Sequence, residues 1–221
     1  MFHYFFTIHL LFLPCIISLK ADTGLFHYFT QYYTTYPRGT YTELARFHSG
    51  KSLYLDTPEP RLDQSSTFSA ISELQMFMEY FPASKRKTEA QQMIFELQDK
   101  LVMKDYLTAK LYYDLGTYTG NASYTADMRI NGNNFLACIT TAQNALKDYP
   151  YTSMREDISI LLLRAKHKLG SESVLEKKEE RMRETIDEYY AFKNEFPESK
   201  YMKEVEAIYK DASKYVKELN E

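Results

Sequence analysis

The residue types that most often carry out chemistry in enzymes are few and scattered in this sequence. The chain has five histidines and two cysteines in 221 residues, and none of them are spaced as paired metal ligands. It contains no glycine-rich phosphate loop and no Gly-x-Ser-x-Gly turn. The many acidic residues fall on the polar faces of expected helices, where solvated carboxylates are the ordinary interpretation. We therefore expect no catalytic residue, no metal site and no cofactor, although the absence of a motif does not by itself exclude an enzyme, because catalytic triads assemble from distant positions.

Two reactive residue types have a structural interpretation instead. His48 follows Leu44 at helical spacing, which favours a packed histidine over a general base. Cys138 lies in an apolar helical stretch and is expected to be a small buried hydrophobic residue. The net charge of −3, with no basic stripe, gives no indication of nucleic-acid binding.

A short turn that contains a proline recurs four times, at Pro37, Pro82, Pro150 and Pro197. An aromatic residue precedes each proline, and a small or helix-capping residue stands two positions after it: Tyr36, Phe81, Tyr149 and Phe196, then Gly39, Ser84, Thr152 and Ser199. An acid follows six or seven positions after the proline and an aliphatic residue eight after it: Glu43, Glu89, Glu156 and Glu204, then Ala45, Ala90, Ile158 and Val205.

This turn has the properties of a joint between two helices. Proline disfavours the helical conformation of the residue before it, so one helix ends there with its aromatic side chain packed inward. The small residue begins the next helix, and the acid favours the positive end of the helix dipole. The prolines are spaced by 45, 68 and 47 residues. These spacings predict stacked helix pairs, with an insertion or an unmarked joint in the middle.

Apolar periodicity predicts helices along nearly the whole chain. The expected ranges are 25–36, 40–54, 67–81, 85 to beyond 101, a separate helix that buries Tyr106, Ala109 and Tyr113 and ends at Gly116, then 134–149, 153–169, 174–196 and 201–219. In the charge-rich range 174–196 we expect a buried side formed by Leu175, Met182, Ile186, Tyr189 and Tyr190. The last range has the polar residues of a capping helix.

Residues 117–134 interrupt this rhythm with glycines, asparagines and threonines. The segment is longer than an ordinary connection between helices, so it is either a functional loop or a tolerated insertion. Its only charged side chains are Asp127 and Arg129. An enzyme with an unrecognised site would have to use this loop, and it offers few groups for that purpose.

Residues 1–24 form a hydrophobic N-terminal segment, with an apolar run from Phe5 to Leu19. The run has the length of a signal-peptide hydrophobic region. No Lys or Arg precedes it, however, and no small-x-small cleavage site follows it. Cys15 is a candidate for lipidation, although Pro14 stands where a lipoprotein signal has a small residue. Two interpretations stay open: an atypical export signal or anchor, and an artefactual N-terminus.

The helix pairs that end in Tyr-Pro or Phe-Pro resemble tetratricopeptide-type repeats. Four stretches sharpen the resemblance: 32–39, 74–84, 109–116 (Ala-Lys-Leu-Tyr-Tyr-Asp-Leu-Gly) and 142–150 (Ala-Gln-Asn-Ala-Leu-Lys-Asp-Tyr-Pro). Together they are similar to the BamD family of outer membrane lipoproteins, which belong to the β-barrel assembly machinery of Gram-negative bacteria. The resemblance covers about residues 27 to 216. Residues 1–24 match neither the family's lipoprotein signal nor its first helix pair, and the loop at 117–134 is longer than the family's usual connection.

The resemblance implies an all-α fold, a right-handed solenoid of tetratricopeptide-like helix pairs over residues 25–221. It also implies a non-enzymatic scaffold at the periplasmic face of the outer membrane, with a lipid anchor that residues 1–24 leave uncertain. The implied partners are the periplasmic domains of the barrel-forming assembly protein and unfolded outer membrane proteins. Tyr112 and Tyr113 are candidates for peptide contact on a concave face, with core packing as the competing interpretation. The alternative function is that of another periplasmic tetratricopeptide-repeat adaptor, in the cell envelope or in division.

Overall fold

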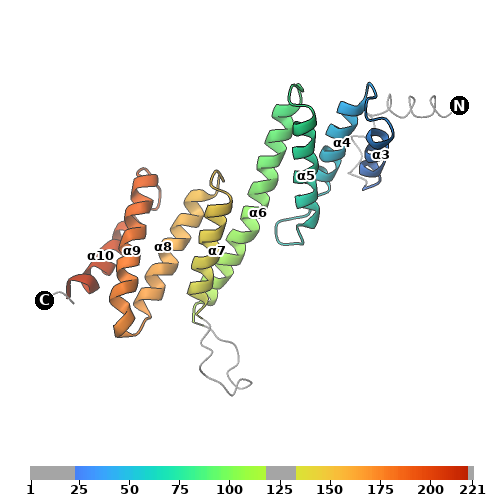
Figure 1. Cartoon of the computed structure of the whole chain (residues 1–221). Helices are drawn as coiled ribbons and strands as arrows, with labels where there is room; N and C mark the ends of the chain where they lie inside the picture. Colours follow the sequence, from blue (N-terminus) through green and yellow to red (C-terminus); the bar gives the residue numbers. More distant parts are fainter. Residues whose placement is uncertain (1–22, 118–132, 219–221) are drawn as a thin grey trace, which may run out of the picture. The chain divides into compact units, whose positions relative to one another are not determined.

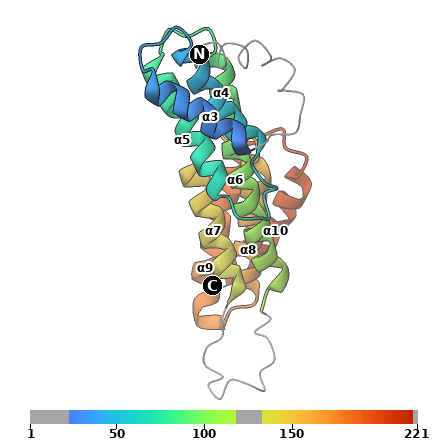
Figure 2. The same cartoon turned by 90° about the vertical axis from the view of Figure 1, so that its right-hand side faces the viewer.

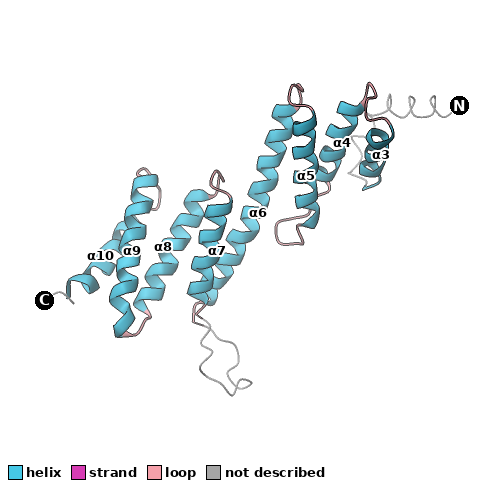
Figure 3. Cartoon of the chain, in the orientation of Figure 1, coloured by secondary structure: helices cyan, strands magenta, loops and turns pink. Residues whose placement is uncertain are grey.

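The computed structural model describes residues 23–117 and 133–218, and within these ranges every regular element is an α-helix (Figure 3). The eight helices are α3 (Thr23–Thr35), α4 (Thr42–Leu55), α5 (Ser65–Tyr80), α6 (Lys87–Leu115), α7 (Asn134–Asp148), α8 (Arg155–Ser171), α9 (Leu175–Glu195) and α10 (Met202–Glu218). The predicted all-α fold of helical repeats is confirmed. The right-handed course of the whole solenoid stays a prediction.

The four proline turns are the joints within four helix pairs, α3/α4, α5/α6, α7/α8 and α9/α10 (Figure 1). All four use the same hydrogen bond. The amide of the small residue donates to the carbonyl of the aromatic residue before the proline, at 3.0 Å for Gly39, 3.0 Å for Ser84, 3.2 Å for Thr152 and 3.1 Å for Ser199. In the last three joints the hydroxyl also accepts a bond from the amide two residues further on. The predicted role of this position at the start of a helix is therefore confirmed.

One aromatic residue of the joints does not pack inward as expected. Phe81, Tyr149 and Phe196 each lie against a core cluster. Tyr36 is 47% exposed, and its ring contacts Tyr32 of α3. The physical reason is that α3 is the first described helix, so that no earlier helix of the described chain covers this side chain.

The chain divides into two compact units, residues 1–101 and 102–221, and α6 contributes to both. In the first unit α4 packs against α3 on one side and α5 on the other (Figures 1 and 2). Its main core combines α4, α5 and the first half of α6: Phe47, Ala70, Leu74, Phe77, Ala90, Met93, Ile94 and Leu97. A smaller cluster of Phe29, Tyr33 and Ala45 joins α3 to α4.

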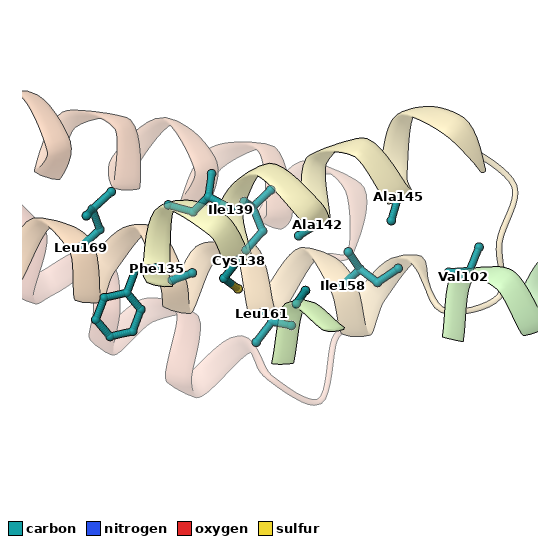
Figure 4. Close-up of a cluster of buried hydrophobic side chains, with 12 residues drawn as sticks. Val102, Phe135, Cys138, Ile139, Ala142, Ala145, Ile158, Leu161 and Leu169 are labelled. Atoms are coloured by element: carbon teal, nitrogen blue, oxygen red, sulfur yellow. The ribbon is translucent and has the colours of Figure 1, made fainter. Parts of the chain in front are cut away.

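In the second unit α7, α8, α9 and α10 pack in sequence. The larger core joins the second half of α6 to α7 and α8, and Figure 4 shows the side chains of α7 meeting those of α8 in it. A second cluster joins α8, α9 and α10 around Leu163, Phe192 and Val205. Among the side chains of α10 that the structure describes, the buried ones form one stripe, Val205, Ile208 and Ala212, and its role as a capping helix stays a prediction.

The prediction of two helices between residues 85 and 116 is wrong, because α6 is a single helix of 29 residues. No glycine or proline lies between Lys87 and Leu115, so nothing in the backbone chemistry stops the helix there. It ends at Gly116, as expected, in the left-handed conformation with φ of +54°. The expected buried side of α9 is also partly wrong: Met182 and Tyr189 are buried, but Leu175 is 84% and Tyr190 49% exposed.

The N-terminal segment and most of the central loop lie outside the described residues, and Cys15 lies there too. The described chain stops at residue 117 and resumes at residue 133. The two ends of the loop meet, because the amide of Asn134 donates to the carbonyl of Gly116 at 3.2 Å. The Asn133 side chain caps α7 by accepting from the amide of Phe135.

The two units repeat the same three polar contacts between neighbouring helix pairs. Each unit has two proline joints, at Pro37 and Pro82 in the first and at Pro150 and Pro197 in the second. A glutamate six residues after the first joint proline accepts from the serine two residues after the second joint proline: Glu43 from Ser84, and Glu156 from Ser199, each at 2.6 Å. A cation fourteen residues after the first joint proline forms an ion pair with a glutamate seven residues after the second joint proline. The pairs are Lys51 with Glu89 and Arg164 with Glu204. The third contact joins a residue seventeen positions after the first joint proline to an acid fourteen positions after the second. It pairs Tyr54 with Glu96 in the first unit and His167 with Asp211 in the second.

Candidate protein-interaction surface

The described residues contain no group of three or more His, Cys, Asp or Glu side chains placed to hold a metal ion. The two residues that the sequence suggested to be packed are indeed packed. His48 stacks on Phe29 and meets Phe47 edge-on, with ring centroids 5.5 and 5.4 Å away. Burial, with the nearby charges of Lys51 and Arg86, lowers its pKa to about 4, so the ring is neutral at ordinary pH.

Cys138 is fully buried between α7 and α8 (Figure 4). Burial, with the nearby Asp114 carboxylate, raises the pKa of its thiol to about 12. A thiol that stays protonated and buried is a poor nucleophile. The predicted structural role is confirmed.

The most organised polar feature of the first unit is a set of three side chains, Tyr33, Arg46 and Tyr80, which we call the tyrosine–arginine clamp. They come from α3, α4 and α5 respectively. The guanidinium carbon of Arg46 lies 4.2 Å from the ring centroid of Tyr33 and 4.0 Å from that of Tyr80. Both distances are within the range of favourable cation–π contacts. The clamp therefore brings three consecutive helices to one point on the surface.

The inner wall of the clamp is fixed by a hydroxyl network. Tyr33 is only 9% exposed, and its hydroxyl donates to Glu73 at 3.3 Å. The same carboxylate oxygen of Glu73 accepts from the buried Ser49 at 3.3 Å, and the Ser49 hydroxyl lies 3.4 Å from that of Thr30. Tyr80 forms the outer wall and is 62% exposed. The clamp thus has one rigid side and one side open to solvent.

A second group of aromatic side chains lies on α9 and α10 of the second unit: the exposed Tyr190, the partly buried Tyr209 and the buried Tyr189 beneath them. The rings of Tyr189 and Tyr209 stack with centroids 4.4 Å apart, and Tyr190 meets both rings edge-on. The hydroxyls of Tyr190 and Tyr209 are 3.3 Å apart. Lys193 donates to the hydroxyl of Tyr189 at 3.1 Å. Tyr190, which is 49% exposed, supplies most of the accessible aromatic area here, and tyrosine is enriched at protein-binding surfaces.

The two tyrosines proposed for peptide contact lie near the end of α6. Tyr112 and Tyr113 are both partly buried against the larger core of the second unit. The ring of Tyr113 meets Phe135 edge-on at 5.8 Å, and burial raises the pKa of its hydroxyl. Each side chain keeps a solvent-exposed part, so a role in peptide contact stays a prediction.

The sequence alone did not bring Arg46, Tyr33 and Tyr80 together as a site. The abundance of tyrosine, 20 residues, indicated aromatic surfaces in general. Nothing in the local sequence of Arg46 distinguishes it from the other arginines, because its two partners lie 13 and 34 positions away in neighbouring helices. Only the packing of α3, α4 and α5 brings them together.

None of the described helices is both long and apolar enough to cross a membrane.

A protein-family model matches a large part of the chain. The family model for YfiO, described as an outer membrane lipoprotein, matches residues 24–182. This range runs from α3 into the first part of α9 and includes three of the four proline joints. No curated protein matches the chain. The match extends over more than half of the sequence and agrees with the BamD-like motifs. The chain belongs to the YfiO family of outer membrane lipoproteins.

Proposed function

We propose that this protein is a non-enzymatic scaffold of the machinery that assembles β-barrel proteins in the outer membrane. It binds the periplasmic domains of the barrel-forming assembly protein and helps to deliver unfolded outer membrane proteins for insertion. The observation that carries the proposal is the family match over residues 24–182, on a chain built from jointed helix pairs. The family's outer membrane location fits this role.

The architecture suits a protein-binding role physically. Helix pairs with fixed joints present side chains from successive helices at regular intervals, which is how repeat proteins bind extended segments. Exposed tyrosines supply contact area while keeping a hydroxyl in water. The candidate contact points are three: the clamp in the first unit, the tyrosines of α9 and α10, and the partly exposed pair Tyr112 and Tyr113.

In this proposal the scaffold is attached to the periplasmic face of the outer membrane. We propose a two-part chain for this purpose, in which residues 1–24 are a hydrophobic segment and residues 25–221 are the binding array with its loop at 117–134. Lipidation at Cys15 is part of the proposal. It can be tested by mass spectrometry of the membrane-bound protein, with Cys15→Ser as the control.

The test of the function is a pull-down from detergent-solubilised cell envelope of the source organism. The bait is residues 22–221, and bound proteins are identified by mass spectrometry. Recovery of the barrel-forming assembly protein is the expected result. Replacement of Tyr190 by alanine should reduce that recovery if the α9–α10 surface is used, whereas Tyr151→Ala, at a 91% exposed position in a joint, is the matched control. Recovery of cell-wall or division proteins alone would replace the proposal with the adaptor alternative.

A further inference from the structure

The clamp in the first unit has an arginine whose hydrogen-bonding capacity is unused within the described chain. The other arginines of the described helices have polar partners: Arg155, Arg164 and Arg183 each bind a glutamate, and Arg181 donates to Ser173. Arg46 makes only its two contacts with tyrosine rings among the described residues. No buried polar side-chain atom of the described residues lacks a partner, so the Arg46 N–H groups that have no protein partner are reached by solvent.

The tyrosine rings orient this arginine for a particular type of ligand. The N–H donors of a guanidinium lie in the plane of the group, and contacts with aromatic rings do not use them as hydrogen bonds to oxygen would. An arginine held between two rings loses little further freedom when its donors bind a planar acceptor, and a carboxylate matches two of the donors at once. We propose that the tyrosine–arginine clamp binds a carboxylate of a polypeptide ligand, either its C-terminal carboxylate or an Asp or Glu side chain.

The surroundings of the clamp are consistent with an incoming carboxylate. The carboxylate of the network, Glu73, accepts from the hydroxyls of Tyr33 and Ser49, and no ion pair joins it to Arg46 among the described residues. Tyr80 is 62% exposed and provides an apolar ring beside the guanidinium for a ligand side chain. Arg46 itself is partly exposed, so that a ligand can approach its edge without movement of the helices.

This inference rests on the proposed function only in taking a polypeptide as the ligand. The probe is the tetrapeptide acetyl-Gly-Tyr-Gly-Tyr with a free C-terminal carboxylate, compared with the same peptide as its C-terminal amide. A third peptide, acetyl-Gly-Glu-Gly-Tyr-amide, carries only a side-chain carboxylate. The readout is the NMR signal of the arginine Nε–H groups in the purified full chain, with Arg46→Lys used to assign the Arg46 signal.

We expect at least one of the carboxylate peptides to shift the Arg46 signal and to bind about tenfold more tightly than the neutral amide. The peptide that binds identifies the source of the carboxylate. Arg46→Lys should remove this preference, because an ammonium cannot make the planar two-point contact, and Tyr80→Leu should weaken it. The matched control is Arg61→Lys, in an exposed turn. Glu73→Gln should strengthen binding by removing a like charge near the ligand.

Equal binding of the amide and carboxylate peptides, or an unchanged preference in Arg46→Lys, would overturn the inference and leave Arg46 as a packing residue. The pull-down with unaltered bait separates this failure from that of the proposed function. If the barrel-forming protein is recovered but the peptides show no preference, only the carboxylate site fails. If the preference is present but the envelope yields only other partners, the site stands and the proposed function fails.

Discussion

His48 shows how a single side chain can couple the packing of two helices to pH. The ring lies between Phe29 of α3 and Phe47 of α4, and burial and neighbouring cations lower its pKa from 6.5 to about 4. Between these pH values the unfolded chain binds a proton that the folded chain does not, so stability falls as the pH is lowered from 6.5 towards 4. Below pH 4 this contribution changes no further.

We therefore expect His48→Phe to remove part of the acid sensitivity of unfolding. From pH 7 to pH 4 the original chain should lose about 1–2 kcal/mol more unfolding free energy than the variant does, a value reduced for the partly exposed position of the ring. Urea titrations at several pH values measure it. His27→Gln on the exposed surface is the control. Parallel pH profiles of His48→Phe and the original chain would contradict the assignment.

The serines of two joints each have two partners, which predicts a measurable loss on truncation. Ser84 donates to Glu43 and accepts from the amide of Arg86. Ser199 has the same arrangement with Glu156 and Tyr201. Replacing either serine by alanine should cost about 1–2 kcal/mol of stability. Thermal unfolding of both variants, compared with Ser69→Ala on the exposed surface of α5, measures the cost. A loss no larger than that of the control would contradict a stabilising role for the two contacts of each hydroxyl taken together.

At the scale of helices, one close approach between α4 and α5 depends on glycine. A Cβ atom added at Gly50 would lie 2.7 Å from Cδ2 and 2.9 Å from Cγ of Leu74, which is fully buried. An alanine ordinarily stabilises a helix relative to glycine by about 1 kcal/mol. Here the overlap should outweigh that gain, and Gly50→Ala should destabilise the protein by about 1–3 kcal/mol.

Gly170 provides the matched comparison for Gly50→Ala. Its added Cβ would meet the sulfur of Met182 at 3.1 Å, and a methionine side chain adjusts easily. Gly170→Ala in α8 should therefore be close to neutral in the same denaturation experiment. A rise in the melting temperature for Gly50→Ala would mean that α4 and α5 are less closely packed than the structure has them.

The helical elements were largely predictable from the sequence because their ends have local chemical causes. Pro82 and Pro197 stop one helix and Ser84 and Ser199 begin the next, and these effects act within a few residues. The single helix α6 was missed because periodicity alone does not show whether two apolar stretches are continuous. The exposure of Leu175 was missed for a related reason: spacing places it on the apolar side of α9, but only the neighbouring helix decides how far that side is covered.

The clamp was beyond reach of sequence reasoning for a different physical reason. Its three side chains have no local signal in common and meet only because α3, α4 and α5 pack side by side. The same holds for the tyrosine surface of α9 and α10, where Tyr190 was expected inside and Tyr209 was not singled out. Contacts between helices depend on their crossing and rotation, which a single sequence does not specify.

At the scale of the whole molecule, the charge pairs at matching positions of the two units should differ in strength. Arg164 binds Glu204 with two hydrogen bonds of 2.7 and 2.6 Å, and this contact lowers the pKa of the glutamate. Lys51 makes one bond of 2.7 Å to Glu89. A double-mutant cycle with alanine should give a coupling of about 0.5–1 kcal/mol for the arginine pair and less for the lysine pair.

Both coupling energies should decrease in 1 M NaCl, because the pairs are partly exposed and the Debye length at that concentration is only about 3 Å. Charge reversal of both members of the arginine pair should restore much of the coupling that either single reversal removes. A coupling for Lys51 and Glu89 that exceeds the one for Arg164 and Glu204 would contradict the view that geometry sets the difference.

Three polar contacts recur at the same sequence positions relative to the joint prolines, and this repetition guides the design of mutations. A substitution at Glu43, Lys51 or Tyr54 has a natural replicate at Glu156, Arg164 or His167, in different surroundings but with the same place in the repeat. An effect seen at both members of such a couple belongs to the repeat as a building unit. An effect seen at only one member marks a place where one half of the protein has been adapted to a task of its own.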